Sequence, residues 1–539
     1  MTTSAAFELA DQAVDLIAAD DPCLGLILGL GSTTPTLTDF SPAGHIARFD
    51  HLRDLADRAA RTPVESDADR IALQVMGQQF GHTLAAADAG DYLRTINVLA
   101  SPPQQVRMAL EFATDDHVAT QLLTQVGPTL AGWRETLHEG VRQDCPAARR
   151  QAVAVAEQMA TYAQAWLPAY VAGRDIPDDA VERARAGFTD TAVWLSDVYA
   201  AMADPEDAVG EERYVRASAA FNGVDLDLDD TYDWGWHEIG RLSVELRREA
   251  DRILPEVPLR DLRAALGDDP TYQIYGVPAL TDHLQRLTEQ ATDRVDQVLF
   301  DIDPRVRECH VRIAAEGSAA APYYVQPSED LSRPGTTWYP TRGAEVFPRW
   351  WLESVWYHEA VPGHHLQLGA TAVQESMSRF QRLLGFTSGH AEGWALYAER
   401  LADELGWFDE PGTRIGFLSA QLMRAVRVVV DIGLHTGRTV PAGFPGQRGH
   451  VTPKMARQLL MDVALLDADF AASEVDRYLG MPGQAISYKV GERVWWELRS
   501  DAKERLGPQF DLKDWHMAAI RLGPMGLAQF RDEMSHYGR

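Results

Sequence analysis

Long runs of helical periodicity constrain this chain more than any other feature of its sequence. Apolar residues recur at intervals of three and four over residues 7–19, 147–173, 179–203, 231–254 and 275–300. This spacing places the apolar side chains along one face of an α-helix, and that face is stable only when it packs against another element. The sequence therefore predicts a mainly α-helical protein with a large buried core.

One region departs from the helical pattern. Residues 311–340 contain the short aromatic and β-branched runs "VRIAAEG", "YYVQP" and "TTWYP", with "SEDLSRPG" between them. Such runs, separated by turn-forming residues, are typical of a small hairpin or sheet. Helical spacing resumes over residues 344–360, so we expect a small β-sheet beside the helix that follows. An edge strand in that position can align an extended peptide by backbone hydrogen bonds.

The length and charge of the chain limit its organisation and its partners. Its 539 residues are enough for two fused lobes, which we expect at residues 1–220 and 221–539. The 50 basic and 79 acidic side chains give a net charge of −29, which disfavours nucleic acid and anionic membranes as partners. The N-terminus has no basic region before its apolar residues, and no apolar run is long enough to cross a bilayer. We therefore expect a cytoplasmic protein.

The segment "WYHEAVPGHHLQLG" (356–369) carries the strongest indication of chemistry. It begins like the zinc-protease motif HExxH, in which two histidines four residues apart bind the metal and the intervening glutamate is the general base. His358 and Glu359 match the first two positions. Pro362 stands where the second histidine belongs, so the motif is interrupted rather than complete.

Two histidines follow the interruption. In an unbroken helix His364 would lie about 240° around the axis from His358, and His365 would lie about 10 Å further along it. Pro362 and Gly363 break the helix, because proline lacks a backbone N–H and glycine tolerates unusual dihedral angles. A bulge there can turn His364 back towards His358. We predict that His358 and His364 bind a metal ion, with His365 as the alternative second ligand.

A third ligand is expected from a later helix. A catalytic zinc takes three protein ligands and keeps one position open for water. The helical stretch 388–406, "SGHAEGWALYAERLADELG", places Glu392 near its first turn. A glutamate on a following helix is the third ligand in gluzincin metallopeptidases, and Glu392 fits that role. The alternative is an ordinary acid near a helix N-terminus, where the dipole favours negative charge.

These motifs resemble a known bacterial family. The pattern HExxPGHxxQ at 358–367, followed by EGWALYAE at 392–399, is similar to the family called domain of unknown function 885. That family is regarded as gluzincin-like, with an architecture related to carboxypeptidase Taq, neurolysin and angiotensin-converting enzyme. The resemblance implies a two-lobed, helical zinc metallopeptidase with a deep channel. Three more segments fit the family, so the likeness covers about 320–500: "YYVQPSEDLSRPGTTWY", "RAVRVVVDIGLHTGR" and "GQAISYKVGE".

The segment 424–438 has a narrow polar stripe within an apolar helix. At 100° per residue its polar members fall within about 80° of one another: Arg424, Arg427, Asp431, His435 and Arg438. We interpret the stripe as a channel wall in which Arg424, Arg427 and His435 contact the substrate, with the arginines placed for a carboxylate. An ordinary solvent-facing stripe is the alternative.

Further candidates come from the resemblance. In the related peptidases a late tyrosine or histidine stabilises the oxyanion, and Tyr488 in "GQAISYKVGE" is the first candidate for that role. His390 and His435 are the alternatives, and a buried structural tyrosine would also explain Tyr488. Tyr324 is a further candidate for contact with the substrate.

The function expected from these residues is zinc-dependent hydrolysis of amide bonds in short peptides. The zinc ion is the expected cofactor, and a carboxypeptidase or dipeptidyl-carboxypeptidase preference follows from the arginine stripe. One alternative is a zinc amidohydrolase that acts on a small metabolite. Another is a helical binding protein that has kept an inherited pocket without activity.

Overall fold

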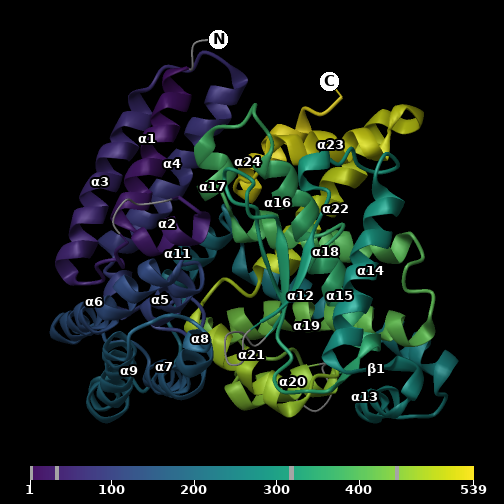
Figure 1. Cartoon of the computed structure of the whole chain (residues 1–539). Helices are drawn as coiled ribbons and strands as arrows, with labels where there is room; N and C mark the ends of the chain where they lie inside the picture. The colour runs from purple at the N-terminus through teal and green to yellow at the C-terminus, as the bar shows by residue number, and fades with distance from the viewer. Residues whose placement is uncertain (1–3, 31–34, 315–320, 443–447, 539) are drawn as a thin grey trace. The chain divides into compact units, whose positions relative to one another are not determined.

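The computed structural model of the protein describes residues 4–30, 35–314, 321–442 and 448–538, and α-helices dominate it (Figure 1). The mainly helical fold predicted from the apolar spacing is confirmed, and each of the five predicted stretches contains helix. The chain divides into two compact units. The first comprises Met1–Asp207 with Ser376–Gly385, and the second comprises Ala208–Ala314, Ala321–Glu375 and Phe386–Arg539.

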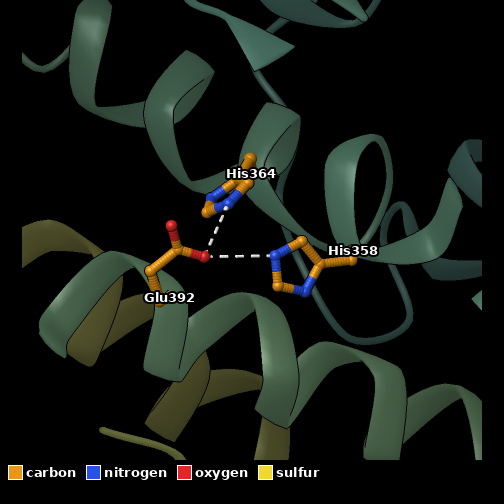
Figure 2. Close-up of side chains that lie close together, drawn as sticks. All are labelled: His358, His364 and Glu392. Carbon is orange, nitrogen blue, oxygen red and sulfur yellow. Dashed lines mark hydrogen bonds and ion pairs between the residues drawn. The ribbon is translucent and has the colours of Figure 1, made fainter. Parts of the chain in front are cut away.

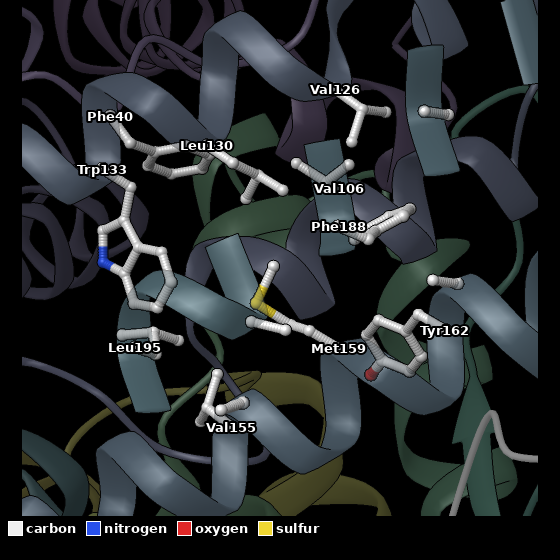
Figure 3. Packing of buried hydrophobic residues seen from close by; sticks show 14 of the residues in the cluster. Phe40, Val106, Val126, Leu130, Trp133, Val155, Met159, Tyr162, Phe188 and Leu195 are labelled. Atoms are coloured by element: carbon white, nitrogen blue, oxygen red, sulfur yellow. The ribbon is translucent and has the colours of Figure 1, made fainter. Parts of the chain in front are cut away.

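The first unit is a helical assembly around its own apolar core. Its helices are α1 (Ala5–Asp20), α2 (Pro22–Leu28), α3 (Pro42–Arg61), α4 (Asp67–Asp88), α5 (Pro102–Glu111), α6 (Asp116–Arg142), α7 (Arg149–Thr161), α8 (Leu167–Val171), α9 (Asp178–Val193), α10 (Ala200–Met202) and α17 (Arg379–Leu384). Leu130 and Trp133 of α6 meet Met159 of α7 and Phe188 of α9 in the core (Figure 3). Burying each of these large side chains stabilises the unit by roughly 1.5–3 kcal/mol.

Helix α17 joins the first unit although it comes much later in the sequence. It packs against α1 and α4. The rings of Phe380 and Phe80 lie edge to face with centroids 5.4 Å apart, and Arg379 forms an ion pair with Asp15 at 2.6 Å. The chain therefore leaves the second unit after α16 and returns to it just before α18.

The second unit holds the remaining helices. They are α11 (Glu211–Asn222), α12 (Leu228–Ile253), α13 (Leu259–Asp268), α14 (Val277–Val295), α15 (Arg349–Glu359), α16 (His364–Ala372), α18 (Ser388–Glu404), α19 (Pro411–Thr436), α20 (Pro453–Asp462), α21 (Ala468–Gly480), α22 (Ser487–Leu506), α23 (Leu512–Leu522) and α24 (Leu527–Ser535). Among the described residues, no helix is both long and apolar enough to cross a membrane.

Two small sheets precede α15 in the second unit. Strand β4 (Thr336–Tyr339) lies between β2 (His310–Ile313), to which it is parallel, and β3 (Tyr323–Val325), to which it is antiparallel. This sheet confirms the change of pattern over residues 311–340. A second sheet pairs β1 (Gln273–Tyr275) with β5 (Val346–Pro348), antiparallel.

The helix expected from residue 344 begins later, at Arg349. Residues Val346–Pro348 form β5 instead, with Phe347 paired to Ile274. Pro348 disfavours a helical conformation at the residue before it, and β1 supplies a partner strand. The strand partner comes from a distant part of the sequence, so local spacing could not reveal it.

The helices that carry the predicted site approach one another closely. Helices α18 and α22 pack together, and α15 contacts both α18 and α19. A Cβ atom added to Gly491 of α22 would lie 1.9 Å from the carbonyl oxygen of Gly389 in α18. Only glycine fits at this crossing, and its absence of a side chain brings the two helix backbones into contact.

Candidate metal centre

The break between α15 and α16 brings the second histidine back to the first. The two helices are joined by residues 360–363, and a Cβ on Gly363 would lie 1.9 Å from the carbonyl oxygen of His358. Trp394 Nε1 of α18 donates to the carbonyl oxygens of Pro362 and Gly363 at 3.0 and 3.1 Å. The rings of His358 and His364 are then 4.8 Å apart. The predicted interruption at Pro362 and Gly363 is therefore confirmed.

Three potential metal ligands meet at this break. Oε2 of Glu392 lies 3.2 Å from Nε2 of His358 and 3.4 Å from Nε2 of His364 (Figure 2). One ligand atom from each of these residues lies within 4.8 Å of the other two. Two imidazoles and one carboxylate match the donor set of catalytic zinc sites, which leave a fourth position for water. The residues present thus fit a zinc ion.

His364, not His365, belongs to this cluster. His365 is buried with its Nδ1 atom 3.0 Å from the hydroxyl of Tyr324 on β3. Burial lowers the pKa of His365 to about 4, so its ring is neutral at physiological pH. Tyr324 therefore contacts His365, which is the residue next to the candidate ligand His364.

A buried carboxylate supports His358 from behind. Oε1 of Glu399 accepts a hydrogen bond from Nδ1 of His358 at 2.9 Å, and Oε2 accepts one from Ser354 at 2.7 Å. Burial alone would raise the pKa of Glu399, but Arg424, at 3.4 Å, and His358 hold it below its usual value. A histidine that donates from Nδ1 presents the lone pair of Nε2 to a metal. The side chain of Arg424 thus pairs with Glu399 and is buried instead of facing solvent.

Glu359 is buried next to the candidate ligands. Burial is the main cause that raises its pKa to about 8, and the carboxylates of Glu392 and Glu399 raise it further. His364 acts in the opposite direction. The carboxyl of Glu359 is therefore largely protonated at neutral pH in the metal-free site.

The structure brings Tyr488 to the same centre. Its ring stacks on the ring of His358, with centroids 5.9 Å apart and planes 20° from parallel. Its hydroxyl accepts a hydrogen bond from Nη2 of Arg477 at 3.1 Å. The guanidinium of Arg427 lies over its ring, 4.4 Å from the centroid. Tyr488 and Arg427 are therefore neighbours, and Tyr488 lies beside a candidate ligand.

His390 and His435 occupy other environments. The ring of His390 packs on Trp495 and Phe530, with centroids 5.2 and 4.8 Å away, and burial lowers its pKa to about 3. His435 is buried against Tyr214, with ring centroids 5.7 Å apart. In the described part of the chain, neither histidine contacts the three clustered side chains.

Comparison with known proteins places the chain in a family. The family described as "Bacterial protein of unknown function (DUF885)" matches residues 22–534. The chain is a member of this family. No curated protein matches it.

Two solved structures are similar to this DUF885 protein over almost its whole length. A "putative lipoprotein" from Colwellia psychrerythraea has a TM-score of 0.85 at 20% identity, with 99% of this chain and 98% of that chain covered. A "putative lipoprotein of unknown function" from Shewanella oneidensis has a TM-score of 0.71 at 17% identity, with 99% and 100% covered. At such identities the likeness concerns the fold.

Two residues beside this cluster, Glu399 and Arg477, were not predicted from the sequence. Glu399 follows Glu392 by seven residues, which places both on one face of α18, two turns apart. That spacing could have identified Glu399 as a partner of the site. Arg477 comes from α21, and no local pattern links it to Tyr488. Only the tertiary structure reveals it.

Proposed function

We propose that this DUF885 protein is a zinc-dependent peptidase that hydrolyses amide bonds in short peptides. The observation that carries the proposal is the convergence of His358, His364 and Glu392, whose ligand atoms lie within 4.8 Å of one another. The two histidines meet only because the helix breaks between them. A break that restores a ligand pair, with a glutamate beside the first ligand, is hard to explain by packing alone.

The donor set supports zinc as the metal. His358, His364 and Glu392 would hold it, and Glu399 would orient the first of these ligands. A zinc ion in this position supplies Lewis-acid polarisation of a carbonyl oxygen and a water molecule of lowered pKa. Glu392 is the most exposed of the three ligands, with 14% of its side chain accessible, compared with 3% for His358 and 9% for His364.

Glu359 is the proposed general base. Its carboxylate takes a proton from the attacking water and passes it to the nitrogen of the departing amine. Burial raises the pKa of Glu359 to about 8 in the metal-free site. A bound cation would favour the ionised form, which is the form that accepts the proton.

Tyr488 is the proposed donor to the oxyanion. Arginine has donors but no acceptor, so the Tyr488 hydroxyl must accept the hydrogen bond from Arg477. The phenolic proton is consequently free for donation to another group. A donor fixed in advance, where negative charge develops, lowers the barrier without reorganisation. His390 and His435 receive no role in this proposal because their rings contact other residues.

The resemblance to gluzincins supports a two-lobed peptidase architecture and a peptide as the substrate. A zinc amidohydrolase with a small-metabolite substrate would use the same residues, so the two differ only in substrate. The cytoplasmic location expected from the sequence also stays a prediction. The two similar bacterial proteins are described as lipoproteins, and fractionation of cells that produce the natural chain tests where this one resides.

The experiment compares zinc-loaded wild-type protein with Glu359→Gln on a library of short peptides and on amide metabolites, read out by mass spectrometry. We expect peptide hydrolysis by the wild type and a loss of roughly 10²–10⁴-fold in the variant, with zinc content unchanged. Hydrolysis of metabolite amides alone would favour the amidohydrolase. Equal behaviour of both proteins, or no uptake of zinc, would contradict the proposal and favour a binding protein.

A further inference from the structure

Three arginines surround the ring of Tyr488. Their guanidinium carbons lie 6.0, 4.4 and 5.7 Å from the ring centroid, for Arg424, Arg427 and Arg477. Two carboxylates, Glu399 and Glu474, form ion pairs with them. Two further carboxyl groups interact electrostatically with Arg424 and Arg477. The three arginines differ in how accessible each guanidinium is to a solute.

Arg424 and Arg427 are buried beside carboxylates, although Nε of Arg424 and Nη1 of Arg427 have no hydrogen-bond partner among the residues that the structure describes. Arg427 donates from Nε and Nη2 to Oε2 of Glu474 at 2.9 and 2.7 Å, and Arg424 pairs with Glu399 at 3.4 Å. Each residue is only 4% exposed. Substrate contact by both arginines stays a prediction from the sequence. Their burial and their partners support a role in holding Tyr488 and Glu399 in position.

Arg477 is the most accessible of the three arginines. Its distance to Glu474 is 3.4 Å, the same as that between Arg424 and Glu399 and longer than either bond from Arg427 to Glu474. Its other partners are uncharged: Nη2 donates to Oε1 of Gln484 at 2.7 Å and to the hydroxyl of Tyr488 at 3.1 Å. Nε of Arg477 has no hydrogen-bond partner within the described ranges. The side chain is 16% accessible, so a solute can reach it.

A neighbouring carboxyl, Asp431, is directed towards other partners, Tyr214 and the amide of Gly483. Asp431 is fully buried and forms no ion pair with Arg477 in the described part of the chain, although the two interact electrostatically. Burial raises the pKa of Asp431 to about 7, so a large fraction of this group is protonated at neutral pH.

Arg477 is linked to both sides of the candidate metal centre. On one side it binds the hydroxyl of Tyr488, whose ring stacks on His358. On the other side its partner Gln484 donates from Nε2 to Oγ of Ser388 at 3.3 Å. Ser388 lies on α18, one helical turn before Glu392. The guanidinium therefore stands next to the proposed oxyanion donor, and a short chain of hydrogen bonds joins it to the helix of the third ligand.

We infer that Arg477 binds the C-terminal carboxylate of the peptide substrate, so that the enzyme is a carboxypeptidase. This inference rests on the proposed function. An extended chain advances about 3.3–3.6 Å per residue. A substrate whose scissile carbonyl meets Tyr488 consequently has its terminal carboxylate near Arg477 when cleavage occurs close to the C-terminus. Nη2 of Arg477 already donates to Gln484 and Tyr488, so a carboxylate would replace Gln484 as an acceptor in order to take two parallel hydrogen bonds from the planar guanidinium.

The test uses one peptide in two forms, with a free C-terminal carboxylate and with a C-terminal amide. The zinc-loaded wild type is expected to cleave the free acid with a kcat/KM at least roughly 10²-fold higher, because a terminal amide cannot accept the charge-assisted hydrogen bonds that a carboxylate accepts from Arg477. Arg477→Gln is expected to raise KM for the free acid and to remove most of this preference. Arg477→Lys, which keeps the charge but not the planar fork, should give an intermediate preference. Arg493→Gln, on the exposed part of α22, is the matched control and should retain it.

The outcomes separate this inference from the proposed function. Equal cleavage of both peptide forms by the wild type overturns the role of Arg477 and leaves the zinc peptidase intact. A full acid preference in Arg477→Gln, with zinc content and thermal midpoint unchanged, also overturns it. Cleavage of neither form by zinc-loaded wild type overturns both. The acid–amide comparison needs no variant, so it remains decisive even if Arg477→Gln fails to fold.

Discussion

Oε1 of Glu399 lies 2.9 Å from Nδ1 of His358, in a place from which solvent is excluded. The contact fixes the tautomer of the imidazole and directs Nε2 towards Glu392. It also gives the ring more electron density, because a carboxylate polarises the N–H bond that it accepts. Glu399 is therefore a positioning residue for the metal centre, and its charge is held in place by Arg424.

Glu399→Gln should weaken zinc binding without unfolding the protein. The amide oxygen can still accept from His358, but the negative charge is lost and Arg424 loses its partner. We expect a 10- to 100-fold loss of zinc affinity. Competition with a chromophoric chelator measures it. Glu404→Gln, at the exposed end of the same helix, is the control, and equal affinities in the two variants would contradict the role of Glu399.

Replacing His364 and replacing His365 should have sharply different effects on zinc binding. His364→Ala removes a ligand of the cluster and is expected to abolish stoichiometric zinc binding, because two remaining ligands do not form a catalytic zinc site. His365→Ala removes a neutral ring that contacts Tyr324 and should retain about one zinc per chain. Metal analysis after gel filtration distinguishes them. Zinc retained in His364→Ala but lost in His365→Ala would show that the other histidine is the ligand.

Tyr488→Phe tests the oxyanion donor. The variant keeps the ring that stacks on His358 and lies beneath Arg427, and it loses only the hydroxyl. We expect kcat to fall by roughly 10²-fold or more, KM to change little, and zinc content to stay the same. Steady-state kinetics on one cleavable peptide measure this. A large rise in KM with an unchanged kcat would instead indicate a role in substrate binding alone.

Local spacing predicted the helices because an amphipathic face is a property of a single segment. It also located the break at Pro362 and Gly363, where two residues that disfavour helix stand together. It did not reveal β5, whose partner Ile274 is more than seventy residues earlier. The same limit applies to Arg477, whose neighbours Tyr488 and Gln484 come from beyond the end of its own helix.

Helix geometry explains why two candidate histidines stand apart from the cluster. His390 precedes Glu392 by two residues, which is about 200° around α18, so its ring faces the opposite side. His435 shares the stripe of Arg424 but follows it by eleven residues, about 16 Å further along α19. A helical wheel shows the direction of each side chain around the axis but not its position along the axis. Residues of one polar stripe, such as Arg424 and His435, can therefore lie too far apart to belong to one site.

The close crossing of α18 and α22 should tolerate no added carbon. Gly491→Ala would place a Cβ atom 1.9 Å from a backbone oxygen of α18, so the helices must separate. We expect a destabilisation of roughly 1–3 kcal/mol or more, and weaker zinc binding because Glu392 and Tyr488 move with these helices. Gly240→Ala, on the exposed face of α12 where an added Cβ has nothing within 4 Å, should instead stabilise by roughly 0.5–1 kcal/mol. Thermal unfolding compares the two variants.

Asp431 should make stability depend on pH in a defined direction. Burial raises its pKa from 3.8 to about 7, while its Oδ2 atom accepts hydrogen bonds from Tyr214 at 2.8 Å and from the amide of Gly483 at 2.9 Å. Between these two pH values the folded state keeps a proton that the unfolded state releases. The contribution of Asp431 to the free energy of unfolding is therefore fully present below pH 4 and is lost as the pH rises through about 7.

Asp431→Asn keeps an acceptor oxygen for Tyr214 and Gly483 but cannot ionise. Its stability relative to the wild type should consequently improve as the pH rises from 4 to 8, by an amount on the order of 4 kcal/mol at about 1.4 kcal/mol per pKa unit. Thermal midpoints of both proteins at several pH values measure the difference, and the comparison cancels the other titrating groups. A difference that is constant over this range would mean that Asp431 titrates at the same pH in the folded and unfolded states. Its carboxylate would then be as well stabilised by Tyr214 and Gly483 as it is by water.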